Sequence, residues 1–390
     1  MTSTQIPRET RPSLLRHVDY FLPVITLVIS AIGVLMVYSA TRGPDTLLRP
    51  AETRFLERQL IFVVIGAAVM IITARIGHRF FQRFALYLYT FMSATLFLVL
   101  IVGVESKGTK AWFQISGYQL QPSEFGKIAL IVALAAWYGT TNTASGRKLV
   151  IALVIAGVPG LLIWRQPDLG TLLVYGAIVA GMTLVAGVKG RHMFIFLLLV
   201  VTLATIVLQS DSLANYQVDR LLVFIDEEAD SGARYNLEQA QVAIGNGGLT
   251  GKGIFEGTQN NSDLVPEQQN DFIFTVIAEE TGFIGSITVL GLLALLLIRV
   301  WRISQIADDK FGSLIAAGVF SMLLFQIFQS VGMAVGIMPI TGIPLPLVSH
   351  GGSSVIATFI AIGLVQSVHM RRHDYRYDGS FWWRETTKTR

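Results

Sequence analysis

Four carboxylates surround the start of an apolar segment in LVPEQQNDFIFTVIAEETG, residues 264–282. Glu267 precedes the segment, Asp271 stands where it begins, and Glu279 and Glu280 follow inside it. A carboxylate at a membrane surface can take a proton from a hydroxyl, so Asp271 is a candidate general base. An aspartate at this place can instead cap the following helix by accepting backbone N–H hydrogen bonds. Both interpretations place Asp271 beside apolar surface.

Two more apolar segments begin with ionisable residues. In QPSEFGK, residues 121–127, Pro122 suits the first turn of a helix, and Glu124 and Lys127 share one helix face. In QPDLGT, Asp168 again follows a Gln-Pro pair. Ionisable groups at membrane depth usually face a protein interior or a water-filled cavity. The competing interpretations are a self-satisfying Glu124–Lys127 pair and an Asp168 that only caps its helix.

Several classes of chemistry are excluded. The chain has no cysteine, which excludes disulfides, thiolate metal sites and cysteine nucleophiles. It has no P-loop, GxGxxG or HExxH motif. His350 and the serines that follow it have no triad partner at a recognisable spacing, so we reject a hydrolase. Any energy or leaving group must come with the substrate.

The composition is that of an all-α polytopic membrane protein. Of the 390 residues, 52% are hydrophobic and 14% are charged, whereas soluble domains carry about 25% charged residues. A spanning helix needs about 20 mostly apolar residues. The chain offers about ten such segments, the second and fifth of them short: 20–40, 59–74, 84–104, 122–139, 149–164, 168–188, 192–209, 279–299, 311–335 and 351–370.

The charge distribution predicts that both termini are cytoplasmic. With that orientation, 19 of the 30 lysines and arginines fall in inner segments and 10 in outer ones, as the positive-inside rule expects. The predicted parts are a cytoplasmic N-terminus at 1–19, a membrane domain at 20–370 and a basic cytoplasmic tail at 371–390. We expect the tail to lie near anionic lipid.

Two outer segments stand out. Residues 210–271, between the seventh and eighth helices, hold 11 carboxylates and three basic residues, and a loop of this length is usually functional or disordered. Its apolar stretches at 221–225 and 239–244 predict short amphipathic helices on the membrane, followed by a glycine-rich turn. Residues 336–354 hold three prolines and four glycines, which predict a rigid loop that ends where Ser353 and Ser354 start the last helix.

These motifs, taken in order, resemble the SEDS family of bacterial shape, elongation, division and sporulation proteins. The resemblance covers about residues 20–370 and rests on KAWFQISGYQLQPSEFGK, QPDLGT, VPEQQNDFIFTVIAEETGFIG and PITGIPLPLVSHGGSS. The sequences PEQQNDFIF and TGIPLP are more similar to those of the elongation members of the family. The resemblance implies a ten-helix fold and a peptidoglycan glycosyltransferase that uses lipid II. It also implies a class B penicillin-binding protein as partner, with other elongation-complex membrane proteins, and no nucleic acid.

The resemblance also assigns residues. Asp271 matches the essential aspartate of the family, and Glu124, Lys127 and Asp168 match polar positions that line its cavity. The chain departs from the family at Lys110-Ala111-Trp112, where Arg-Trp is common, and at His350, where tyrosine is common. A lysine keeps a phosphate contact but not the bidentate fork of arginine, so Lys110 is a weaker candidate ligand than Lys127.

The implied reaction moves a sugar from a pyrophosphate-lipid donor to a sugar hydroxyl with one inversion. Asp271 would act as the base, and positive charge would stabilise the leaving pyrophosphate. Lys127 is the first candidate for that charge, and Arg220 and Lys252 are weaker candidates in the loop. A divalent cation between Asp271 and the pyrophosphate is compatible with this chemistry, although no spacing specifies one. The alternatives are a lipid II flippase and a non-catalytic scaffold of the cell-wall synthesis complex.

Overall fold

The computed structural model describes residues 17–42, 53–106, 108–115, 117–140, 146–195, 198, 232–261 and 267–372. Its helices are α1 (Phe21–Thr41), α2 (Arg54–Ile76), α3 (His78–Arg83), α4 (Ala85–Val102), α5 (Pro122–Gly139), α6 (Gly146–Trp164), α7 (Leu169–Val185), α10 (Gly232–Gly247), α11 (Thr258–Asn261), α12 (Ile273–Ile306), α13 (Lys310–Val335) and α14 (Gly352–Met370). The mainly helical, polytopic architecture is confirmed.

Nine of the ten predicted spans coincide with a helix. The seventh, 192–209, lies for the most part outside the described residues. Within the described ranges, seven helices are long and apolar enough to cross a membrane, and α7 is a shorter apolar helix of 17 residues. The number of ten spans and their orientation stay predictions.

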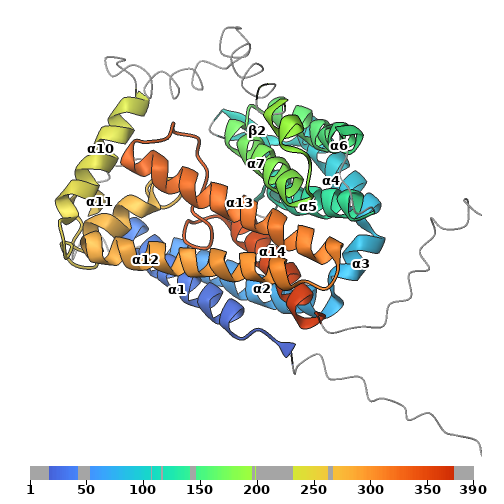
Figure 1. The fold of residues 1–390 in the computed structure, drawn as a ribbon. Helices are drawn as coiled ribbons and strands as arrows, with labels where there is room; N and C mark the ends of the chain where they lie inside the picture. The colour runs from blue at the N-terminus through green and yellow to red at the C-terminus, as the bar shows by residue number, and fades with distance from the viewer. Residues whose placement is uncertain are drawn as a thin grey trace, which may run out of the picture.

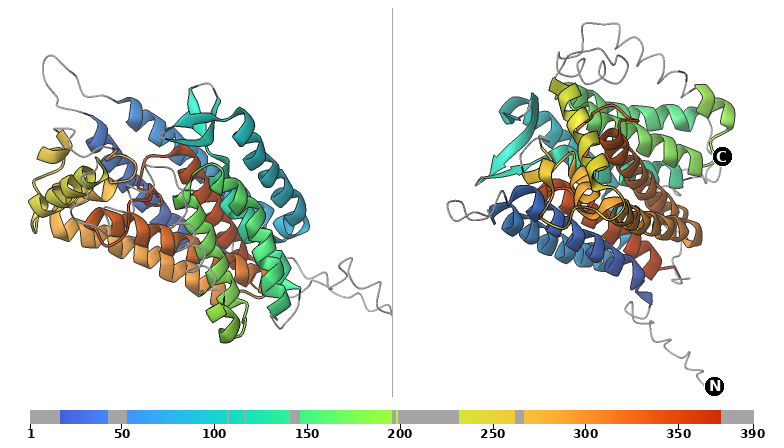
Figure 2. Two further views of the ribbon diagram at one scale, coloured as in Figure 1. Left: turned by 90° about the horizontal axis from the view of Figure 1, so that it is seen from above. Right: turned by 90° about the vertical axis from the view of Figure 1, so that its left-hand side faces the viewer.

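The helices pack in two groups around α14. Helices α1, α2, α12 and α13 lie against one another and against α14, while α4 to α7 form a second group beside α13 (Figures 1 and 2). The most apolar 18-residue stretch of α14 is 83% buried, whereas that of α4 is 17% buried. The loop that leads into α14 is therefore positioned by the centre of the bundle, and α4 presents most of its surface to lipid.

The two described ends of the chain meet at one end of the bundle. The Nδ1 atom of His369, near the end of α14, lies 3.2 Å from the carbonyl oxygen of His17. Asp19, just before α1, forms a 2.5 Å ion pair with Arg299 near the end of α12. This arrangement agrees with an even number of spans, as the prediction of two cytoplasmic termini requires.

A small antiparallel sheet was not among the predicted elements. Strands β1 (Val104–Ser106), β2 (Thr109–Ile115) and β3 (Tyr118–Leu120) pair in that order between α4 and α5. Gly108 and Gly117 make the turns with φ of 78° and 84°, a conformation that glycine adopts without strain. Strands this short have no readable alternation of apolar residues, so their pattern in the sequence is weak.

Helix α12 begins earlier than the predicted span and contains a break. It starts at Ile273, and Gly282 interrupts it with φ 66° and ψ −163°. The glycine-rich turn after α10 fills this break with backbone hydrogen bonds. Lys252 N–H donates to the Glu279 oxygen and Gly253 N–H to the Glu280 oxygen, both at 3.0 Å. Phe283 and Ile284 donate in return to Gly248 and Leu249, at 2.9 and 3.1 Å.

The outer loop is thus attached to the bundle by main-chain contacts, in part as predicted. Helix α10 contains the apolar stretch 239–244, and the turn that follows is glycine-rich. However, α10 does not lie free on the membrane, because Ala240 and Ala243 pack against Phe272 and Phe274 at the start of α12. The other predicted amphipathic stretch, 221–225, lies outside the described residues.

We expect Gly251→Ala to release this turn from α12. Gly251 has φ 81°, and an added Cβ would lie 2.1 Å from the backbone oxygen of Glu280. The positive φ alone costs about 1–2 kcal/mol for an L-residue. The measurement is the rate of limited proteolysis between α10 and α12, together with thermal unfolding in detergent. Both should show a looser loop in the variant.

The matched control is Gly245→Ala, which also adds one methyl group near the same turn. Gly245 lies inside α10 and has open space around its Cβ position. Alanine should therefore be tolerated, with a gain of up to about 1 kcal/mol in helix propensity. Equal protease sensitivity of the two variants would show that the fit of the turn into the break is unimportant.

Candidate functional site

Asp271 lies on a short turn directly before α12. The N-cap residue of α12 is Phe272, whose side chain makes no capping hydrogen bond. Asp271 therefore stands one residue before the N-cap position of α12. The side chain is half-buried, at the end of the bundle opposite to the described termini. The structure thus presents the carboxylate at the mouth of the membrane helices.

Contacts with α1, with the loop 336–351 and within the turn itself hold the residues around Asp271. Gln268 donates from Nε2 to the Ala40 oxygen at the end of α1, at 3.0 Å. The backbone oxygen of Gln269 accepts from the N–H of His350, at 2.9 Å. Asn270 closes the turn on itself by donating to Glu267 Oε2, at 2.7 Å. A carboxylate on a turn held at both sides keeps its position, as a general base requires.

Glu279 and Glu280 anchor neighbouring segments, and both side chains are 1% exposed. Glu279 Oε1 accepts from Thr258 Oγ1 at 3.1 Å and from the N–H of Gln259 at 2.9 Å. It also forms a 3.5 Å ion pair with Lys252. Glu280 accepts from Ser39 of α1 at 2.5 Å. Of the four carboxylates, these two attach the loop and α1 to α12.

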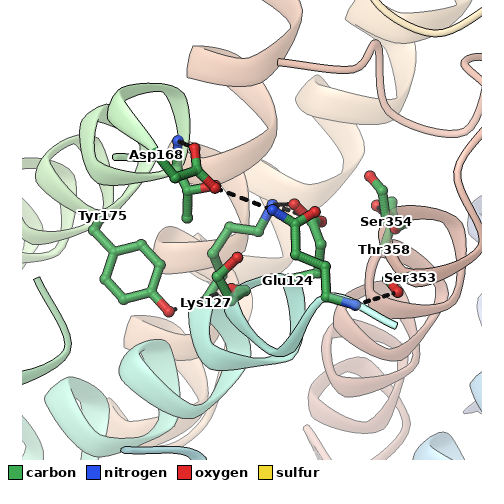
Figure 3. Close-up of polar contacts among 10 residues, drawn as sticks. Glu124, Lys127, Asp168, Tyr175, Ser353, Ser354 and Thr358 are labelled. Atoms are coloured by element: carbon green, nitrogen blue, oxygen red, sulfur yellow. Dashed lines mark hydrogen bonds and ion pairs between the residues drawn. The ribbon is translucent and has the colours of Figure 1, made fainter. Parts of the chain in front are cut away.

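A buried polar cluster connects α5, α7 and α14 (Figure 3). The Nζ atom of Lys127 lies 2.7 Å from both carboxylate oxygens of Glu124. Lys127 is 2% exposed and Glu124 4% exposed. The self-satisfying pair considered from the sequence is therefore present. The intact pair adds little net stability, but removing either partner would leave a buried charge uncompensated and would be strongly destabilising.

Asp168 joins the same cluster and also caps α7. Its carboxylate accepts from the N–H of Thr171 at 2.9 Å and from the Thr171 hydroxyl at 2.8 Å. Gln121, before α5, donates from Nε2 to Asp168 Oδ2 at 3.0 Å, and its own N–H donates to Ser353 Oγ at 2.9 Å. Gln121 therefore connects the starts of three helices, and the two Gln-Pro motifs meet in space (Figure 3).

The other candidate cations lie apart from this cluster. Lys110, on β2, donates from Nζ to the Ile101 oxygen at the end of α4, at 3.1 Å. Lys252 belongs to the glycine-rich turn, and its side chain is 28% exposed. Arg220 lies outside the described residues. Among the residues whose positions are described, no three His, Asp or Glu side chains gather as they would around a metal ion.

Gln59 of α2 and His350 of the loop 336–351 make contacts that the sequence analysis did not predict. Gln59 of α2 is fully buried and donates to the Ser349 oxygen at 3.2 Å. His350 lies 3.1 Å from Gln59 Oε1 through Nδ1 and also holds Gln269 of the Asp271 turn. The sequence QQN at 268–270, between Glu267 and Asp271, could have indicated a fixed turn, because three consecutive amides can donate and accept hydrogen bonds. No neighbouring residue in the sequence marked Gln59 as part of the site.

The stability of the protein should fall between about pH 6.5 and pH 4. Burial, followed by the nearby Arg58 charge, lowers the pKa of His350 to about 4. The unfolded chain therefore binds a proton that the folded chain rejects, so stability is present above pH 6.5 and is lost as pH falls toward 4. The difference is about 3 kcal/mol. Between about pH 6.5 and pH 4, the melting temperature should depend less steeply on pH in His350→Gln than in the wild type. An equal dependence in both proteins would contradict the assignment.

This fold and site define a class of protein: a polytopic membrane protein with a buried polar cluster and a fixed carboxylate at one membrane face. The profile of the family described as "Cell cycle protein", that of FtsW, RodA and SpoVE, matches residues 20–374, and the chain belongs to this family. This is the SEDS family indicated by the motifs. The chain is accordingly a multi-pass protein of the bacterial cytoplasmic membrane.

Three known proteins illustrate the similarity. The peptidoglycan glycosyltransferase MrdB of Escherichia coli K12 is 34% identical over 358 residues, covering 91% of this chain and 94% of MrdB. A chain from a peptidoglycan synthase complex, solved in work on the coordination of polymerization and crosslinking, has a TM-score of 0.77 at 31% identity. RodA of Thermus thermophilus has a TM-score of 0.68 at 30% identity. Both structural matches cover 91% of this chain and 98% of the other.

Proposed function

We propose that this protein is a peptidoglycan glycosyltransferase that polymerises lipid II into glycan strands at the outer face of the cytoplasmic membrane during cell elongation. The observation that carries the proposal is the half-buried Asp271, held on a fixed turn at the mouth of the membrane helices. Similarity to MrdB, which is named for this activity, supports it.

In the proposed reaction Asp271 is the general base. Its carboxylate takes the proton of an acceptor sugar hydroxyl, and the oxygen attacks the anomeric carbon of the donor. The bond from that carbon to the pyrophosphate breaks, and the configuration inverts in one displacement. A positioned base contributes roughly 10²–10⁴-fold. No second carboxylate is needed as an acid, because pyrophosphate departs without a proton.

The departing pyrophosphate needs positive charge, which can supply a large part of the rate. Lys127, the first candidate from the sequence, is buried against Glu124. Lys252 carries a partly exposed ammonium on the outer turn, so we place it ahead of Lys127 for this role. Glu124 and Asp168 then set the charge and geometry of the cluster around Lys127. If a divalent cation takes part, Asp271 would be the residue that holds it, and the ion would supply further positive charge to the departing pyrophosphate.

We further propose that the protein works with a class B penicillin-binding protein, which crosslinks the new strand, and with other membrane proteins of the elongation complex. The structural match that comes from a peptidoglycan synthase complex supports this partnership. A transpeptidase that crosslinks the new strand needs a fixed surface on the polymerase to bind. The turn after α10 offers such a surface, because backbone hydrogen bonds attach it to α12.

The test uses the purified full chain with its matched transpeptidase in detergent and fluorescent lipid II. Glycan strands should form with the wild type and not with Asp271→Asn. A second assay in vesicles measures lipid II transport across the bilayer. Transport without strand formation would replace the polymerase with a flippase, which the buried polar cluster also favours. If the folded protein shows neither activity in the presence of an active partner, the scaffold role remains.

A further inference from the structure

Aromatic rings from three elements gather beside the turn that holds Asp271. They are Phe55 and Phe62 of α2, Tyr118 of β3 and His350 of the loop 336–351, and we call them the outer aromatic cluster. Phe55 and His350 meet edge to face at a centroid distance of 5.2 Å, and Phe62 and Tyr118 do so at 5.9 Å. The Arg58 guanidinium lies over the Tyr118 ring, 5.4 Å from its centroid.

The cluster lies close to the proposed base. The N–H of His350 donates to the oxygen of Gln269, two residues before Asp271. Two residues of chain span at most about 7 Å. The cluster and the carboxylate therefore lie within the length of a short oligosaccharide of each other.

The contacts of Gln59 determine which ring nitrogen of His350 carries the hydrogen. Gln59 donates from Nε2 to the Ser349 oxygen, and a carbonyl oxygen can only accept. The Oε1 atom of Gln59 therefore faces His350 Nδ1, 3.1 Å away. An amide oxygen is also only an acceptor, so Nδ1 carries the hydrogen.

The other ring nitrogen of His350 is left as an acceptor. Burial lowers the pKa of His350 to about 4, so the ring is neutral at pH 7, and its Nε2 carries a lone pair. Nε2 forms no hydrogen bond within the described part of the chain, and it is not among the fully buried polar atoms. Tyr118, on the same cluster, is 42% exposed. The rings of His350 and Tyr118 both lie against Phe62, at centroid distances of 6.2 and 5.9 Å, so the acceptor and the partly exposed tyrosine belong to one cluster.

We propose that the outer aromatic cluster is a sugar-binding subsite, in which His350 Nε2 accepts a hydrogen bond from a hydroxyl or acetamido N–H of an N-acetylated glycan. The Tyr118 ring packs against the apolar face of the same sugar, since aromatic side chains combine large contact area with fixed geometry. This inference deepens the proposed function and rests on a glycan being the substrate.

The test measures binding of a soluble β-1,4-linked N-acetylglucosamine tetrasaccharide to the full chain in detergent. The Asp271→Asn background is used, so that binding is read without turnover. His350→Asn keeps a donor near the Nδ1 position and loses Nε2, whereas His350→Gln places a polar group near Nε2 and loses the Gln59 contact. One hydrogen bond corresponds to about tenfold in affinity.

We expect His350→Asn to raise the dissociation constant about tenfold and His350→Gln to raise it less than about threefold. Tyr118→Ala should also weaken binding about tenfold, while Tyr118→Phe should not. Thermal unfolding checks that each variant is folded. The opposite order of the two His350 variants would assign His350 a purely structural role and overturn the subsite. Absence of binding by the parent protein would overturn it as well.

The two proposals can fail separately. If Asp271→Asn still polymerises lipid II while His350→Asn loses the tetrasaccharide, the base assignment is wrong and the subsite stands. If Asp271→Asn is inactive and all His350 variants bind alike, the base assignment stands and the subsite is wrong.

Discussion

Asp271→Asn is expected to lower the rate of glycan polymerisation by roughly 10²–10⁴-fold, the contribution of one positioned base. The loss should fall on kcat, with little change in KM for lipid II, because the amide keeps the shape of the side chain and loses only its ability to take a proton. Thermal stability should change little, since Asp271 is only half-buried and asparagine keeps its size. Initial rates with labelled lipid II and the matched transpeptidase measure this.

Glu267→Gln is the matched control for that experiment. Glu267 belongs to the same turn, and its carboxylate accepts from Asn270. The substitution removes one negative charge near Asp271 and keeps the shape of the turn. We expect at least half of the wild-type rate. If both variants lose activity equally, the effect would come from charge on the turn or from its shape, and Asp271 would lose its assignment as base.

Lys127→Met is expected to destabilise the protein by about 3–5 kcal/mol, because Glu124 would be left buried without its counter-charge. The double variant Glu124→Gln with Lys127→Met removes both charges and should recover most of that stability. Thermal unfolding in detergent measures both changes. A Lys127→Met protein as stable as the wild type would show that the pair is hydrated or open in solution.

The activity of the double variant separates structure from function at this cluster. If Glu124 and Lys127 only satisfy each other, the double variant should polymerise lipid II at the wild-type rate. We expect instead less than about a tenth of that rate, because the pair stands beside Gln121 and Asp168, where its fixed charges orient the polar groups that join α5, α7 and α14 (Figure 3). Substitution at Gln121 should then lower activity without exposing a buried charge.

The membrane class and most of the spans could be predicted from the sequence. A helix in lipid must satisfy every backbone group internally, so a span requires an apolar segment of readable length. The same reasoning located Pro122 and Asp168 at helix starts, which the structure confirms. The strands between α4 and α5 were not predictable in this way, because each has only three to seven residues.

The roles of the carboxylates could be predicted from the sequence only in part. Local sequence identified Asp271, Glu124, Lys127 and Asp168, because an ionisable residue beside an apolar run is unusual wherever it stands. The sequence placed Glu279 and Glu280 inside the apolar segment that Asp271 opens, but it did not show which groups these two glutamates bind. The tertiary structure supplies those partners: Thr258, Gln259 and Lys252 for Glu279, and Ser39 of α1 for Glu280.

The sequence by itself determined that this chain spans a membrane, that its charges collect at a few helix ends and that it resembles one family. Those properties depend on hydropathy and on residues close together in the chain. The tertiary structure decided which charges pair, which turn is fixed and which ring nitrogen of His350 accepts. Gln59 and His350 are almost 300 residues apart, and a contact at that distance follows from packing, which no local pattern encodes.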